Sequence, residues 1–150
     1  MINSFGQFIL FIVTISILGY GFWLAYEPWF KLAAFFETEL PNPPEIFFEQ
    51  RSFILAATRM KGCVNVGVVE QKLYLSHTSP LSNFIKPLLI DLDAITKIDF
   101  LDSAPLFNRA YQLYIGKPNI TTLILSQELI ERLEEEYGEP IFSNKLGELR

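Results

Sequence analysis

The only cysteine and the only histidine of the chain, Cys63 and His77, lie at the two ends of one stretch, CVNVGVVEQKLYLSH. A thiol next to an imidazole can act as an activated nucleophile, provided that the two groups lie within hydrogen-bond reach. Two runs of alternating apolar residues flank the charged bend at 70–72, and this pattern predicts a β-hairpin that brings the two ends together. A Cys–His catalytic pair is therefore the first chemistry to consider.

The strand register of this hairpin decides whether the two side chains can meet. A shift of one residue turns every side chain to the other face of the sheet, so the apolar pattern selects the register. With Val66 opposite Leu75 and Val68 opposite Leu73, one face is apolar. The other face then carries Asn65, Gly67, Tyr74 and Ser76. In this register, and in the other one that keeps a face apolar, the cysteine and the histidine point to opposite faces, so we expect no enzyme.

Four aspartates are the other candidate ligands, and they lie close together in the sequence: Asp91, Asp93, Asp99 and Asp102. A hard cation needs several converging oxygens, and this spacing is not that of a calcium-binding loop. The chain also lacks a Gly-rich phosphate loop and the HExxH and GxSxG motifs. We interpret the aspartates as polar turn residues and expect no catalytic residue, no cofactor and no metal site.

The charge balance argues against two classes of partner. The chain has 150 residues, with 12 Lys and Arg against 17 Asp and Glu, for a net charge of −5. Sequence-independent nucleic-acid binding needs clustered basic residues, so no nucleic acid is expected as a partner. The same sign argues against strong binding of the domain to anionic lipids. A single cysteine allows no internal disulfide, which fits a reducing compartment.

The first 26 residues contain no charged side chain. A helix of the 19 residues from Phe8 to Tyr26 rises about 28 Å, close to the hydrocarbon thickness of a bilayer. A cleaved signal peptide would need a basic start and a small-residue cleavage site, and a buried core helix would need a larger domain. Residues 1–26 are therefore predicted to form a transmembrane helix, with residues 5–26 in the lipid bilayer. The expected membrane-interface anchors are Trp23, Tyr26, Trp29 and Lys31.

Residues 27–45 are predicted to form a juxtamembrane helix and a Pro-rich connector. Pro28 suits the first turn of a new helix, because its missing N–H group would be unpaired there anyway. The helix is expected to end before a stiff spacer that contains Pro41, Pro43 and Pro44. This segment could be an interfacial helix on the membrane surface or the last turns of the spanning helix, and alternatively it packs on the soluble domain. Lys31, close to the apolar segment, favours a cytoplasmic C-terminal domain.

Residues 46–139 are predicted to form the soluble domain. Apolar positions recur in about seven short runs, most of them with a period of two, which is typical of a small β-sandwich or barrel. The runs are 52–58, 64–68, 72–76, 87–92, 96–100, 111–115 and 120–125. The period then changes to that of a helix, with Ser126 as its N-cap and Gly138 and Pro140 as its stop signal. We therefore expect a closing helix at 126–138 and a C-terminal tail at 140–150.

Three segments carry a resemblance to a known fold: KGCVNVGVVEQKLYLS at 61–76, KPLLIDLDAI at 86–95, and LYIGKPNITTLIL at 113–125 followed by LIERL. The pattern resembles the pleckstrin-homology-like (PH-like) superfold in its bacterial, GRAM-like form, and in particular short bacterial single-pass proteins. The resemblance implies a mainly β fold with one C-terminal helix, in a partly open barrel of about seven strands, at the bacterial inner membrane. The loop HTSPLSNFIK departs from lipid-binding members, because it carries one lysine and no arginine.

A membrane-anchored binding or scaffold module is the function that this reading predicts. The anchor would hold the domain close to a membrane-associated protein partner and raise its effective concentration there. The alternative is a small-ligand or lipid-binding module that uses the barrel mouth and the loop at 77–86, with His77, Phe84 and Lys86 as its candidate residues. An aromatic residue at a loop tip can rest on the membrane or fold into the core, and for Phe84 we expect the core.

Overall fold

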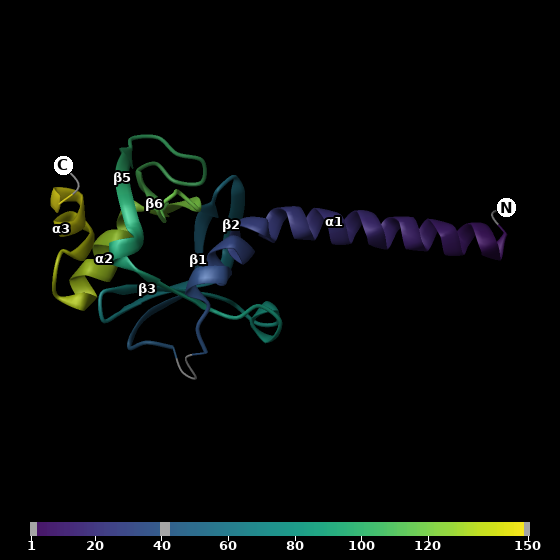
Figure 1. The fold of residues 1–150 in the computed structure, drawn as a ribbon, viewed down its shortest axis with the longest axis horizontal. Helices are drawn as coiled ribbons and strands as arrows, with labels where there is room; N and C mark the ends of the chain where they lie inside the picture. Colours follow the sequence, from purple (N-terminus) through teal and green to yellow (C-terminus); the bar gives the residue numbers. More distant parts are fainter. Residues whose placement is uncertain (1–2, 40–42, 149–150) are drawn as a thin grey trace.

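The computed structural model describes residues 3–39 and 43–148 (Figure 1). Pro41 of the predicted spacer and the chain ends at 1–2 and 149–150 lie outside the described residues. In the described part, a long helix leaves one end of a β domain that carries two shorter helices (Figure 1). The helices are α1 (Ser4–Phe36), α2 (Gln127–Tyr137) and α3 (Ile141–Glu148).

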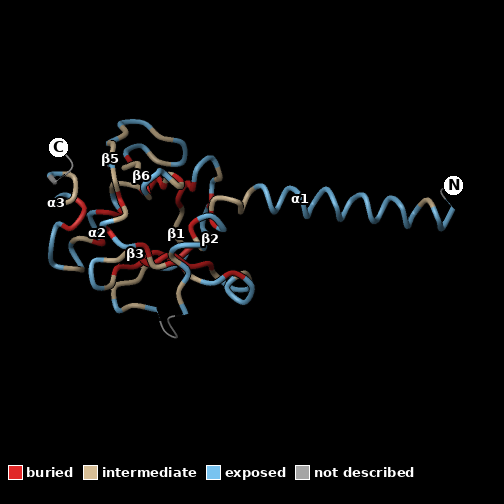
Figure 2. The backbone as a smooth tube through the Cα atoms, viewed as in Figure 1, coloured by how far each residue is buried: buried red, intermediate tan, exposed pale blue. Residues whose placement is uncertain are grey.

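Helix α1 begins at an asparagine cap, where Asn3 Oδ1 accepts a hydrogen bond from Gly6 N at 2.8 Å. None of its apolar stretch is buried in the domain, and Figure 2 shows this stretch exposed along almost its whole length. Within the described residues, α1 is the one helix long and apolar enough to span a membrane. Thr14 Oγ1 donates to the carbonyl of Leu10 at 2.8 Å, so its hydroxyl is satisfied within the helix.

The helix does not start again at Pro28, so the segment that follows belongs to the same helix as the apolar stretch, which was one of the alternatives. Proline removes one backbone hydrogen bond from a helix interior, yet α1 continues without a break to Phe36. The turns after Pro28 bury Trp29 and Leu32 in the core, and this packing offsets the lost bond. Figure 1 shows these last turns lying against the sheet. Residues 29–36 are therefore the end of the same helix that carries the apolar stretch, and they pack on the domain.

Seven antiparallel strands form one curled sheet in the order β4-β3-β2-β1-β7-β6-β5, which confirms the predicted fold class. The first strand begins at Ile46, six residues before the predicted run at 52–58. It ends at Leu55, because the turn falls at 56–57 and Thr58 already belongs to the second strand. Two short 3-10 helices, η1 (Leu81–Asn83) and η2 (Leu92–Ala94), flank the fourth strand. The strands are β1 (Ile46–Leu55), β2 (Thr58–Val69), β3 (Lys72–His77), β4 (Leu88–Asp91), β5 (Ile95–Leu101), β6 (Ala110–Ile115) and β7 (Thr121–Ser126).

The predicted register of the β2–β3 hairpin is confirmed. Val66 pairs with Leu75 and Val68 with Leu73, and all four side chains are buried in the core. The turn uses Glu70 and Gln71 at φ 49° and 59°, a left-handed conformation at both positions. Turns of this hand match the twist of the two strands that they join.

The core is enclosed between the concave face of the sheet and the helices. Helix α2 is capped by Ser126, whose Oγ accepts from Leu129 N at 3.2 Å, and it ends at Gly138 with φ 85°. This confirms the predicted closing helix. Helix α3 replaces the predicted tail, and it adds buried Ile141 and Phe142 to the core. Two adjacent apolar residues after a proline give no helical period, which is why the sequence pattern does not reveal this helix.

Gly67 lies in β2 where residues 44–47 come too close to leave room for a side chain. A Cβ atom at this position would lie 2.5 Å from the carbonyl oxygen of Ile46 and 2.8 Å from Cγ of Pro44. We expect Gly67→Ala to lower the free energy of unfolding by about 1–3 kcal/mol, because the backbone must move to admit the methyl group. Gly147→Ala in α3 is the matched control, since no atom lies within 4 Å of its Cβ position. Urea denaturation of both variants measures the difference, and an unchanged midpoint for Gly67→Ala would contradict the close approach.

Candidate binding surface

The ring of His77 packs inside the protein, at the junction between α1 and the β2–β3 hairpin. The residue is 2% exposed, and its ring centroid lies 4.4 Å from that of Trp29 and 5.3 Å from that of Tyr26. Neither ring nitrogen has a hydrogen-bond partner among the described residues. Burial lowers the pKa of His77 to about 4, so the ring is neutral near pH 7. This histidine therefore packs as an aromatic core residue.

Cys63 does not form a pair with this ring. His77 pairs with Val64 across the hairpin, so Cys63 lies one residue out of register with it, and its half-buried side chain packs against the core. Because neither nitrogen of the ring has a hydrogen-bond partner, the thiol is not within hydrogen-bond reach of it. Burial also raises the pKa of Cys63, which keeps the thiol protonated. The backbone carbonyl of Cys63 accepts from Thr78 N at 3.0 Å and from Thr78 Oγ1 at 3.2 Å.

The loop from Thr78 to Ile85 joins β3 to β4 and exposes one aromatic side chain. Phe84 is 83% exposed, so the prediction that it belongs to the core is wrong. Its neighbour Ile85 is the residue that turns inward and is buried. The turn of η1 at 81–83 sets this alternation, because Ile85 N donates to the carbonyl of Leu81 at 2.9 Å.

Lys86, the third residue of the predicted binding loop, is held by carboxylates at the end of α1. Its Nζ lies 2.9 Å from Glu39 Oε1 and 3.7 Å from Glu37 Oε1. The hydrogen bond to Glu39 raises the pKa of Lys86, and the same bond lowers the pKa of Glu39. The adjacent backbone is tied as well, since Thr38 N donates to the carbonyl of Pro87 at 3.0 Å. The positive charge of Lys86 is therefore already matched within the chain.

A surface cavity of about 550 Å³ lies on the outer face of the hairpin, beside this loop. Asn65 and Ser76 form its polar floor, and the Asn65 amide is used within the protein: Nδ2 donates to Ser76 Oγ at 3.2 Å, and Oδ1 accepts from Gln50 N at 3.1 Å. His77 borders the cavity with its backbone, whose carbonyl accepts from Asn65 Nδ2 at 3.3 Å. The apolar parts of the lining come from Pro43, Phe47, Tyr74, Ile85 and Pro87. Such a cavity could take a small amphipathic molecule.

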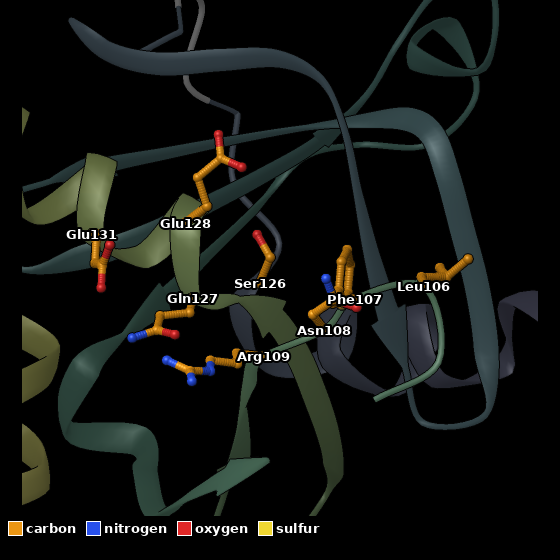
Figure 3. Close-up of a pocket in the computed structure, with 8 residues that line it drawn as sticks. All are labelled: Leu106, Phe107, Asn108, Arg109, Ser126, Gln127, Glu128 and Glu131. Carbon is orange, nitrogen blue, oxygen red and sulfur yellow. The ribbon is translucent and has the colours of Figure 1, made fainter. Parts of the chain in front are cut away.

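A second cavity, of about 660 Å³, opens where α2 begins (Figure 3). Arg109 and Gln127 point in the same direction there, whereas Glu128 turns away from them (Figure 3). The backbone joins the two segments, since Gln127 N donates to the carbonyl of Arg109 at 3.0 Å. Nothing in the sequence pattern indicated this hollow, because its residues come from an irregular loop and a helix start. Six of its eight lining residues are polar or charged, with Leu106 and Phe107 as the apolar ones, and they select no particular ligand.

The predicted interface anchors occupy different environments. Trp23 is exposed on the apolar part of α1, and Lys31 is exposed beyond it and pairs with Glu27 at 3.3 Å. Tyr26 is half-buried against His77. Trp29 is 1% exposed, so its ring is covered by protein and not by lipid headgroups. Its burial follows from the continuation of α1 into the core.

The four aspartates are spread over turns and strands, and three of them have partners. Asp91 Oδ1 accepts from Asp93 N at 3.1 Å and so caps η2. Asp99 pairs with Lys97 at 3.4 Å, and Asp93 with Lys145 at 3.9 Å. Within the described residues, no three carboxylate, cysteine or histidine side chains come together as a group that could hold a metal ion.

The disposition of charge along the molecule is uneven. The stretch from Leu73 to Ile85 has no acidic or basic side chain apart from the neutral His77. Helix α2 carries Glu128, Glu131, Glu134, Glu135 and Glu136 at the end of the domain opposite to the exit of α1 (Figure 1).

Comparisons with known protein families, with curated proteins and with solved structures find no match to this chain.

The buried histidine makes a pH effect on stability measurable. The pKa of His77 is about 4 in the folded protein, against an ordinary value of 6.5, so the unfolded chain binds the proton more readily. The contribution of the neutral His77 ring to the free energy of unfolding is complete above pH 6.5. It is lost as the pH falls towards 4, and the loss amounts to about 3 kcal/mol at most. We expect the free energy of unfolding of the native chain to fall over this window more steeply than that of His77→Leu. Equal slopes for the two proteins in urea titrations at pH 7, 6, 5 and 4 would contradict the burial of a neutral ring.

Proposed function

We propose that this protein is a single-pass membrane-anchored module of the PH-like type, whose domain binds a membrane-associated protein partner. The observation that carries the proposal is the double role of α1. Its first part is apolar and exposed, and its last turns place Trp29 and Leu32 in the domain core. A domain joined in this way to a bilayer-spanning helix cannot swing relative to that helix, so it stays close to the bilayer surface and to its neighbours in the membrane.

The PH-like type is supported by the curled antiparallel sheet of seven strands and by α2, which packs over one end of it. We further propose that the domain lies on the cytoplasmic side of a bacterial inner membrane. The support for this orientation is Lys31 beside the apolar segment, with Arg51, Arg59 and Lys61 further along the same side.

The choice of a protein partner over an anionic lipid headgroup rests on charge. Lys86 is the one basic side chain of the loop at 77–86, and it is held by Glu37 and Glu39. A headgroup phosphate would have to compete with these two carboxylates for it. The cavity of about 550 Å³ keeps a small-ligand function as the second candidate. Its polar floor is satisfied internally, so it offers few free groups to fix the orientation of a ligand.

Crosslinking in the native membrane tests the proposal. A photoreactive amino acid is placed in the full-length chain at exposed positions around the domain, with one further position at Ile12 in the exposed part of α1 as a control for contacts made in the bilayer. We expect one membrane protein to be recovered from several domain positions by mass spectrometry. Recovery of no recurrent protein from any domain position would contradict the proposal.

A further inference from the structure

The domain makes its first contacts with α1 at Ala25 and Tyr26, directly after the exposed apolar stretch of the helix. Thr58 Oγ1, in the β1–β2 turn region, donates to the carbonyl of Ala25 at 3.0 Å. The ring of His77, at the end of β3, lies 5.3 Å from that of Tyr26. No spacer therefore separates the apolar segment from the domain. When α1 spans a bilayer, the end of the domain from which α1 leaves lies against the bilayer surface.

The loop at 78–85 projects from this same end. Figure 1 shows the turn that contains η1 reaching as far towards the N-terminal end of α1 as any other part of the domain. Because α1 runs along the horizontal axis of that view, this comparison holds whatever the depth of the loop in the picture. The acidic helix α2 and the edge strand β5 lie at the other side of the domain (Figure 1).

The chemistry of the loop suits the membrane interface. Its eight residues, TSPLSNFI, carry no charge. At 83% exposure, Phe84 is the most exposed large hydrophobic side chain among the described residues, above every residue of α1 itself. A phenylalanine fully presented to water is unfavourable by about 1.5–3 kcal/mol relative to a buried one, so an apolar cover over Phe84 would be stabilising. The bilayer that surrounds α1 is the nearest apolar phase.

We propose that the 78–85 loop is a second membrane contact of this protein, in which Phe84 enters the headgroup region of the bilayer that α1 spans. The inference rests on the proposed membrane anchor and adds a second point of attachment beside it. Two contacts at different positions fix the rotation of the domain about the axis of α1, which a single helix leaves undefined. The surface presented to a partner is thereby fixed as well.

Spin labels on the full-length protein in vesicles of phosphatidylcholine and phosphatidylglycerol test this contact. Cys63→Ser removes the native thiol, and a label is then attached to Ile12→Cys, Phe84→Cys or Phe100→Cys. Phe100 is the matched control, because it is an exposed aromatic residue on β5, at the side of the domain away from α1. Collisions of each label with oxygen, which concentrates in lipid, are compared with collisions with a water-soluble nickel complex. Circular dichroism checks that the three labelled proteins share one fold.

We expect the oxygen-to-nickel ratio to be severalfold higher at position 84 than at position 100, and highest at position 12. The ratio at 84 is expected to stay the same in high salt, because the contact involves no charge. Equal ratios at 84 and 100, with a high ratio at 12, would overturn the loop contact and leave the anchor standing. An immobile label at 84 that neither reagent reaches would assign Phe84 to a protein contact and would also overturn it. A low ratio at 12 would overturn the anchor and the loop contact together.

Discussion

Trp29→Ala is expected to lower the free energy of unfolding by about 3–5 kcal/mol, the range for removal of a large aromatic side chain from a packed core. Trp29 is 1% exposed, and its side chain packs against the ring of His77, with 4.4 Å between the ring centroids. Its Nε1 has no hydrogen-bond partner among the described residues, so the loss comes from packing and not from a broken hydrogen bond. Urea denaturation of the full-length protein in detergent, followed by circular dichroism, measures the change.

Phe35→Ala is the matched control for this variant. Phe35 is an aromatic residue on the same turns of α1, but it is 71% exposed. Its substitution is expected to change the free energy of unfolding by no more than about 0.5 kcal/mol. A similar loss for both variants would show that the last turns of α1 contribute through helix formation alone, and it would contradict their place in the core.

A fragment of residues 45–150 is expected not to fold cooperatively, whereas a fragment of residues 24–150 is expected to do so. The shorter fragment lacks Trp29 and Leu32, which are almost fully buried, and also the half-buried Tyr26, Ala33 and Phe36 that pack against the same core. The loss of two large core side chains approaches the total stability of an ordinary domain, about 5–15 kcal/mol. It also leaves the apolar core open on the side that α1 covers.

Two measurements compare the fragments. The 45–150 fragment is expected to bind a hydrophobic dye and to give poorly dispersed amide resonances, and the 24–150 fragment to give a dispersed spectrum and a sharp unfolding transition. A cooperative transition of equal midpoint in both fragments would contradict the account. The comparison matters in practice, because Pro43 and Pro44 suggest a domain boundary in the sequence. A fragment that begins at this boundary lacks the core residues that α1 supplies.

The strands and the hairpin register could be predicted from the sequence because the signals are local. Val66, Val68, Leu73 and Leu75 alternate with polar or small residues, and only registers that keep these four on one face give an apolar surface. The same pattern separated Cys63 from His77. The cap at Ser126 and the stop at Gly138 likewise depend on residues close in the chain.

The junction between anchor and domain could not be predicted, because it depends on contacts between distant residues. A proline usually ends or kinks a helix. Only the packing around Pro28 shows that α1 continues through this residue. Trp29 has the sequence context of an interface anchor, and its burial depends on His77, which lies 48 positions further along the chain. Phe84 and Ile85 are adjacent apolar residues, and nothing local to them indicates which one faces the core.

Amide hydrogen exchange of the full-length protein in lipid nanodiscs tests the central claim most directly, namely that one continuous helix both spans the bilayer and completes the domain core. The account predicts slow exchange for residues 29–36, comparable to that of the buried β2 and β3 strands, with no rapidly exchanging segment at Pro28. Fast exchange across residues 27–36, between a protected apolar helix and a protected sheet, would contradict it, because the anchor and the domain would then be joined by a hinge.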